Sequence, residues 1–184
     1  YLTGQGITGS KLTGNNNTAI GASAGLLLQG SATNNTLIGA FAGDALTNGG
    51  GNTGVGLSAL STEDTGGGST AVGYQALKVQ NIDSASVYNT AVGYDAGVSI
   101  STGVRNTAIG GLALDLQATT HDSVAVGWNA LTANTAGEMT AVGTSALEAN
   151  TSGARNVAVG YNALATNIGD TDNTAVGHLA LWKS

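Results

Sequence analysis

A five-residue unit, Asn-Thr-Ala-Val-Gly, recurs along the whole chain and limits what the chain can fold into. Two copies are identical, at residues 89–93 and 173–177, and eight more are close variants. Aligned on the last residue of the unit, ten glycines follow one another at intervals of 18, 17, 17, 20, 17, 17, 16, 17 and 17 residues. They are Gly21, Gly39, Gly56, Gly73, Gly93, Gly110, Gly127, Gly143, Gly160 and Gly177. This period is typical of a solenoid, in which each unit buries its apolar face against its neighbours.

The residues around each repeat glycine predict a short strand that ends at a corner. Directly before the glycine all ten residues are Val or Ile, and three before it eight are Thr and two are Val. β-branched residues at alternate positions favour one face of a strand. The glycine is expected where the corner needs positive φ or a close backbone approach. We expect a second short strand after the corner, through a segment that reads Ala-Leu in seven copies and Ala-Gly in three.

Four residues before the glycine stand seven Asn, two Ser and Met139. Side-chain amides stacked one layer apart can hydrogen-bond to each other and to the turn backbone, so this column predicts an asparagine ladder. We interpret the invariant columns as structural rather than chemical. Their representatives are Asn89, Val92, Gly93 and Ala96 in the fifth copy, Asn156, Val159, Gly160 and Ala163 in the ninth, and Asn173, Val176, Gly177 and Ala180 in the tenth.

Together the columns predict an all-β parallel β-solenoid of about ten 17-residue coils. Residues 1–16 are interpreted as an irregular lead-in and residues 17–184 as one repeat domain. The longest link, residues 78–88, is the best candidate for a protruding loop. Neither end carries an evident polar cap, so we expect both ends to abut further segments of the same fibre or stacked copies.

Charged residues avoid the repeat unit. Of the 16 Asp, Glu, Lys and Arg residues, only Asp95 falls within four positions of a repeat glycine. A strand with water on one side normally alternates apolar and polar residues. Here both sides are small or apolar, which predicts a strand covered on both faces. The inside of the coil provides one cover, and another chain is expected to provide the other.

Composition excludes several functions. A net charge of −6 with only five basic residues argues against a nucleic-acid surface. No apolar run reaches the length of about 18 residues that a membrane helix needs, so no membrane insertion is expected. The chain has no Cys, which excludes disulfides and cysteine metal sites. No residue pattern calls for a cofactor.

Two forms of the repeat resemble known families. Residues 123–127 and 156–160 resemble the Ser/Asn-Val-Ala-Ile/Val-Gly unit of trimeric autotransporter adhesin heads. The longer form at residues 70–77 and 156–164 is similar to repeats of bacteriophage tail-fibre shafts and related bacterial surface proteins. The resemblance covers residues 17–182, although the period of 17 residues is longer than that of the adhesin head.

The resemblance implies a left-handed β-roll that assembles, intertwined or side by side, as a homotrimer. It also implies an extracellular place, on a virion tail fibre or a bacterial cell surface, and a non-catalytic role in attachment to a host receptor or surface. Two alternatives stay open. Hexapeptide-type left-handed β-helix acyltransferases use a related Ile/Val-Gly-x-x-Ala unit, but their aliphatic residue recurs every six positions. Ice-binding solenoids share the low charge and the Thr column.

The sequence contains a few residues that could support catalysis or metal binding, but the neighbouring residues that such sites need are missing. Residues 4–9 spell Gly-x-Gly-x-x-Gly without the strand and helix that dinucleotide binding requires. His121 and His178 occupy different repeat positions, which makes a metal pair or general base improbable. The acid pairs 63–64 and 170–172 are expected to be solvated turn residues. Directly after the glycine, one column holds Tyr74, Tyr94, Trp128, Tyr161 and His178. We expect these rings to wedge between chains or coils, with stacking on a surface glycan as the alternative.

Overall fold

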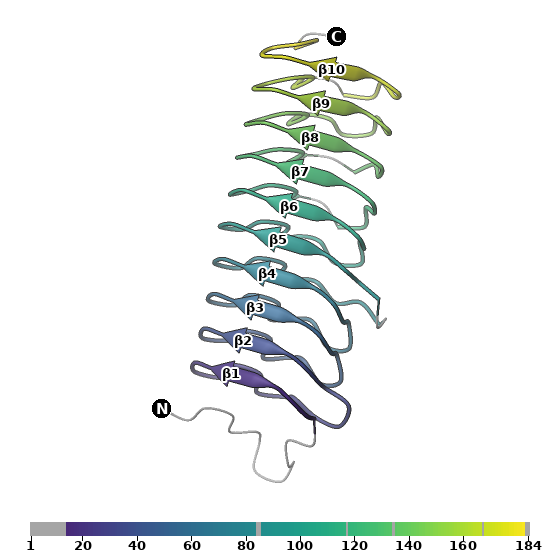
Figure 1. Cartoon of the computed structure of the whole chain (residues 1–184). Helices are drawn as coiled ribbons and strands as arrows, with labels where there is room; N and C mark the ends of the chain where they lie inside the picture. The colour runs from purple at the N-terminus through teal and green to yellow at the C-terminus, as the bar shows by residue number, and fades with distance from the viewer. Residues whose placement is uncertain (1–13, 84–85, 117, 134, 167, 183–184) are drawn as a thin grey trace.

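The computed structural model describes residues 14–83, 86–116, 118–133, 135–166 and 168–182. These residues form a rod of stacked coils with one strand in each coil (Figure 1). The strands are β1 (Thr18–Ile20), β2 (Thr36–Ile38), β3 (Thr53–Val55), β4 (Thr70–Val72), β5 (Thr90–Val92), β6 (Thr107–Ile109), β7 (Val124–Val126), β8 (Thr140–Val142), β9 (Val157–Val159) and β10 (Thr174–Val176). The described chain contains no helix. The predicted all-β parallel solenoid of about ten 17-residue coils is confirmed.

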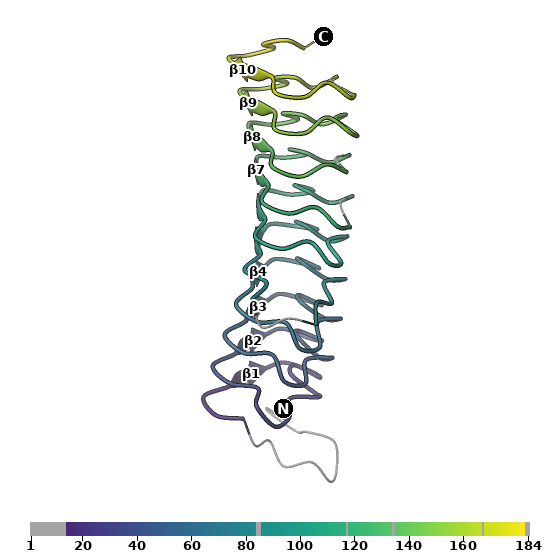
Figure 2. The same ribbon diagram turned by 90° about the vertical axis from the view of Figure 1, so that its right-hand side faces the viewer.

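The ten strands form one parallel sheet in the order of the sequence, from β1 to β10. Equivalent residues of neighbouring coils pair, so that Thr90 lies beside Thr107 and Val92 beside Ile109. Each strand contacts only the strands directly before and after it. The sheet runs along one side of the rod and the connecting loops lie on the other (Figure 2).

The two faces of the sheet differ. The central residue of a strand, such as Ala91 in β5, is fully buried inside the coil. The first and third residues point outward, and Val92 is 37% exposed while Val176 is 69% exposed. The buried inner face was predicted. The outer face is equally free of charge, and in the single chain it is open to solvent.

The predicted second strand through the Ala-Leu segment is wrong. In the fourth coil Gln75 and Leu77 have φ of 52° and 50°, so the chain turns tightly there. The turn directs Ala76 and Leu77 into the core, where both are fully buried. Leu77 N still donates to the Ala96 carbonyl at 3.1 Å in the next coil. Hydrogen bonds between coils and burial of the side chain offset the strain of a left-handed leucine.

The corner at the repeat glycine is confirmed. All ten glycines have φ between 127° and 143°. At Gly56 an added Cβ would lie 2.2 Å from the Gly73 carbonyl oxygen of the next coil, closer than any real contact. Both the positive φ and the close stacking therefore require glycine.

The asparagine column forms a ladder as predicted, but mainly through backbone groups; amide bonds to amide where Asn35 Nδ2 donates to Asn17 Oδ1 at 3.0 Å. The Asn106 side-chain oxygen accepts a hydrogen bond from Ser123 N at 3.1 Å in the next coil. Its amide group donates to the Thr120 carbonyl at 2.7 Å. Where Met139 replaces asparagine, its sulfur lies 3.4 Å from Asn156 N and takes the place of the amide oxygen.

The predictions for the lead-in, the Gly-x-Gly-x-x-Gly pattern and the long link concern residues that the structure describes only in part. Most of the expected lead-in and the whole Gly-x-Gly-x-x-Gly pattern lie outside the described residues. In the long link, residues 84–85 are also outside them. The described part of this link does not simply protrude, because Gln80, Ile82 and Val87 are buried. No described helix is long and apolar enough to cross a membrane.

Candidate interaction surface on the outer strand face

The most extensive candidate site is a surface that we call the outer stripe. It consists of the first and third residues of strands β1–β10 and the residue directly after each repeat glycine. The interstrand hydrogen bonds continue past the glycine, since Gly93 N donates to Val72 O at 2.8 Å and Asp95 N to Tyr74 O at 2.9 Å. The residue after the glycine therefore stacks on its equivalent in the next coil, and it is not buried in any coil.

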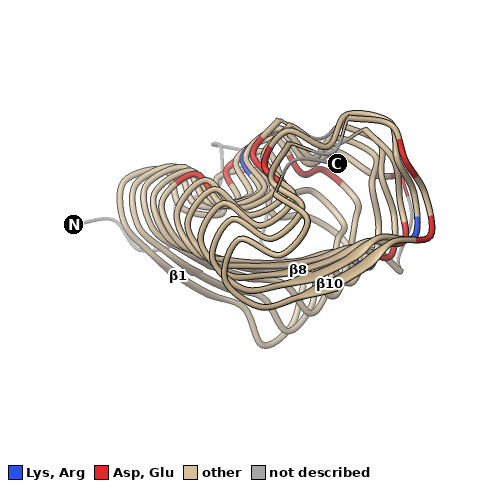
Figure 3. Ribbon diagram, turned by 90° about the horizontal axis from the view of Figure 1, so that it is seen from above, with Lys and Arg blue, Asp and Glu red and all other residues tan. Residues whose placement is uncertain are grey.

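The outer stripe consists mainly of Val, Ile, Thr and aromatic side chains that are exposed or half-buried, and it contains no Asp, Glu, Lys or Arg. Seen from above, the charged residues lie on the loops and at the corner before the strands (Figure 3). Exposed members of the stripe include Ile20 at 50%, Ile109 at 40% and Trp128 at 51%. A long, uncharged and partly apolar surface of this kind is a candidate interaction site.

The aromatic residues of the stripe stack on one another along the rod. The rings of Tyr74 and Tyr94 lie 5.1 Å apart and are nearly parallel, at 8°. Tyr161 and His178 are 5.4 Å apart at 12°. Between these pairs, the Trp128 ring occupies the space that a side chain at Gly111 would fill. Each stacked pair covers one ring face against a neighbouring coil, although Tyr94 and Tyr161 stay 55% and 51% exposed.

The other columns predicted from sequence have structural positions. Ala96 and Ala163 are fully buried in the core, and Asn89 and Asn156 are buried in the ladder. Val92, Val159 and Val176 belong to the outer stripe. The Ala180 side chain packs against the main core cluster. The repeated Ala, Asn and Val columns thus contain side chains with structural roles and no reactive groups.

The two histidines singled out in the sequence are not brought together in the described part of the chain. His178 stacks on Tyr161, whereas His121 lies on the corner before β7. No group of three His, Cys, Asp or Glu side chains among the described residues could hold a metal ion. Asp64 is a turn acid whose carboxylate accepts the Thr47 hydroxyl.

Glu63 is a buried acid that sequence reasoning placed on the surface. It is fully buried, and its carboxylate accepts Gly66 N at 2.7 Å and the Gln80 side-chain amide at 2.7 Å. Gln80 in turn accepts a hydrogen bond from the Asn89 amide at 2.8 Å. The buried network joins the link of one coil to the asparagine ladder. A signal was present, since Glu63 occupies the repeat position of the buried Leu46.

Asp115 is held in an unfavourable environment. Burial raises its pKa, and the charge of Asp95 raises it further, while the backbone N–H groups of Asp115 and Leu116 lower it. One oxygen of its carboxylate is buried without a hydrogen-bond partner. The Asp44 carboxyl pKa is raised by burial as well.

We expect Asp115→Asn to stabilise the protein at neutral pH, by less than about 1 kcal/mol because the side chain is partly solvated. The pKa of the folded state lies above that of the unfolded state, so the ionised carboxylate lowers stability at neutral pH. As pH falls through the raised pKa, the wild type becomes protonated and the difference shrinks. Urea unfolding of both proteins across this pH range measures the effect. A difference that grows on acidification would contradict it.

Comparison of the chain with protein-family models, curated proteins and solved structures finds no match in any of the three.

Proposed function

We propose that the chain is a non-catalytic structural and adhesive module, a trimeric shaft or head of a phage tail fibre or bacterial surface adhesin. In this proposal it is a left-handed β-roll that works outside the cell and supports attachment to a host receptor or surface. The observation that carries the proposal is the outer stripe. It runs along the whole described sheet with its side chains exposed or half-buried, and covering it requires a partner of equal length and equal regularity.

Another copy of the same chain meets this requirement. Each copy has the same column spacing, so the stripes of parallel copies stay in register from one coil to the next. Association would bury Val, Ile, Thr and aromatic side chains without desolvating any Asp, Glu, Lys or Arg, which favours a stable apolar interface. The number three comes from the resemblance to trimeric fibres.

The test is the oligomeric state of the wild type and of a double variant, Val126→Asp with Val159→Asp. We expect the wild type to be a detergent-resistant trimer by native mass measurement. The double variant should be monomeric, because each interface carboxylate would be buried without a partner. Its circular dichroism should stay that of the wild type, since both valines are only half-buried in the single chain.

A matched control is Thr102→Asp with Ser152→Asp, which adds the same charge on exposed loop positions away from the stripe. This control should remain trimeric. A monodisperse wild-type monomer would overturn the proposed function, and a trimeric Val126→Asp, Val159→Asp variant would show that the interface lies elsewhere.

Ice binding is the second candidate, because the Thr column lies on the exposed face of a regular sheet. Eight of the ten strands begin with Thr, and adjacent strands are about 4.8 Å apart. A thermal-hysteresis assay separates the two candidates. Hysteresis in a monomeric preparation supports ice binding, whereas its absence together with a trimer supports the fibre.

A further inference from the structure

A hollow on the corner before strands β7–β9 differs from the rest of the rod. The coil that ends at Gly143 has 16 residues, one fewer than its neighbours. In other coils the backbone N–H groups of two consecutive residues at this corner donate to one carbonyl of the next coil. Thr151 N and Ser152 N, for example, both donate to Ile168 O. In the short coil Thr135 N donates to Thr151 O at 3.0 Å.

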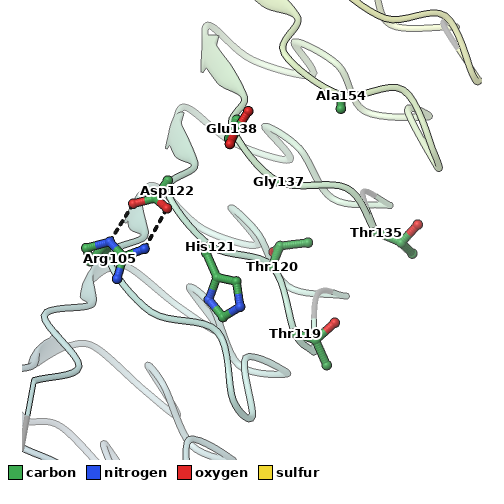
Figure 4. Close-up of a pocket in the computed structure, with 9 residues that line it drawn as sticks. All are labelled: Arg105, Thr119, Thr120, His121, Asp122, Thr135, Gly137, Glu138 and Ala154. Carbon is green, nitrogen blue, oxygen red and sulfur yellow. Dashed lines mark hydrogen bonds and ion pairs between the residues drawn. The ribbon is translucent and has the colours of Figure 1, made fainter.

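Gly137 leaves a gap in the shortened coil. The equivalent residues of the coils before and after it are His121 and Ala154. A hollow of about 320 Å³ opens here, lined by loop residues of four successive coils (Figure 4). This volume is at the lower end of the range for small-molecule sites.

One side of the hollow is a column of charged residues. Arg105 pairs with Asp122 through two hydrogen bonds of 2.6 and 2.7 Å. The Arg105 guanidinium keeps the Asp122 carboxyl pKa below its usual value, so this acid is ionised. One coil further along, Glu138 is exposed, and its carboxylate forms no hydrogen bond or ion pair with any residue that the structure describes. Arg155, in the following coil, pairs with Asp172 instead.

The remaining lining groups supply hydrogen-bond donors and hydroxyls. His121 Nδ1 accepts a hydrogen bond from Val104 N at 3.0 Å, so the neutral ring carries its proton on Nε2 and can donate from there. Thr119 adds an exposed hydroxyl. Thr120 is only 5% exposed, and its hydroxyl has no partner among the described residues.

These groups select a ligand class. Two carboxylates against one guanidinium repel phosphate and carboxylate ligands, and apart from the His121 imidazole the lining contains no aromatic ring and no large aliphatic side chain for a flat apolar ligand. A molecule with several hydroxyls can donate to Glu138 and accept from His121 and Thr119 at once. We propose that the hollow binds one neutral sugar unit, either a free monosaccharide or the terminal unit of a glycan. This proposal does not depend on trimer formation.

The experiment follows backbone amide signals of the ¹⁵N-labelled full chain by NMR during titration. The probes are the free sugars and methyl glycosides of glucose, galactose, mannose, fucose and N-acetylglucosamine, with inorganic phosphate and methylammonium as charged comparisons. We expect at least one sugar to shift the Gly137 and Glu138 amides saturably, with a millimolar dissociation constant. Equal affinity for a free sugar and its methyl glycoside would identify the ligand of the hollow as the terminal unit of a glycan. Binding of the free sugar but not of its methyl glycoside would identify the ligand as a free monosaccharide.

Glu138→Gln is the decisive variant, because it keeps the shape and removes the charge. It should weaken sugar binding about tenfold, as expected for loss of a charge-assisted hydrogen bond. Glu148→Gln makes the same change outside the hollow and should bind as the wild type does. Thr119→Val should also weaken binding, and both lining variants should keep the wild-type circular dichroism. Absence of a saturable shift with every sugar, equal binding by the two Gln variants, or binding of methylammonium or phosphate alone would overturn the proposal.

Discussion

Gly56→Ala is expected to destabilise the rod by at least about 3 kcal/mol, a large effect for a single methyl group. The residue has φ of 137°, which an alanine adopts only with strain. The added Cβ would also lie 2.2 Å from the Gly73 carbonyl oxygen, a backbone atom that cannot rotate away. To relieve this contact two stacked coils would have to separate, with loss of hydrogen bonds on both sides.

Gly54→Ala is the matched control, two residues earlier in strand β3. It makes the same chemical change where eight other strands already carry Ala. The new Cβ would meet the flexible Leu37 side chain at 3.2 Å, so a small rotation of leucine relieves the contact. We expect a change within about 1 kcal/mol. Urea unfolding followed by circular dichroism measures both variants. Equal stability of the two would show that the corner does not require glycine.

Asn106→Ala should cost about 2–4 kcal/mol in the free energy of unfolding. The asparagine is 1% exposed, and its removal leaves Ser123 N and the Thr120 carbonyl without partners inside the rod. Each buried, unsatisfied backbone group costs about 1–3 kcal/mol. Thermal and urea unfolding measure the loss.

Two further variants separate ladder contacts from general effects of losing an asparagine. Asn106→Asp keeps an acceptor for Ser123 N but places a carboxylate oxygen against the Thr120 carbonyl, so it should be at least as unstable as the alanine variant. Asn48→Ala removes an exposed asparagine with weak contacts and should stay within about 0.5 kcal/mol of the wild type. Similar losses in Asn48→Ala and Asn106→Ala would contradict a special role of the ladder.

The sequence predicted those parts of the fold that repeat in identical form. Val92 and Ile109 occupy equivalent positions because one alternation of apolar residues recurs in every coil, and the asparagine and glycine columns have one geometry each. The Ala-Leu segment misled because leucine is normally not a left-handed residue. The sequence did contain a sign of the left-handed turn, because three copies carry Gly in place of this Leu. Two of these glycines, Gly25 and Gly97, have φ of 57° and 58°.

The candidate surfaces were predictable to different degrees. Columns identified in the sequence contain every residue of the outer stripe, although only the structure shows that the Thr and Val/Ile columns face outward and the central Ala column inward. The hollow could not be predicted, because it arises where a one-residue deletion and the absent side chain of Gly137 coincide. The burial of Glu63 was marked by its alignment with the buried Leu46, whereas no local pattern reveals its hydrogen bond with Gln80 in the next coil.

Because each strand contacts only the strands directly before and after it, the rod behaves as a stack of interchangeable discs. Duplication of one 17-residue coil would push the two ends about 4.8 Å further apart and leave the contacts of distant coils unchanged. Unequal recombination between near-identical gene segments could therefore adjust the reach of the rod in small, uniform increments without a new fold having to evolve.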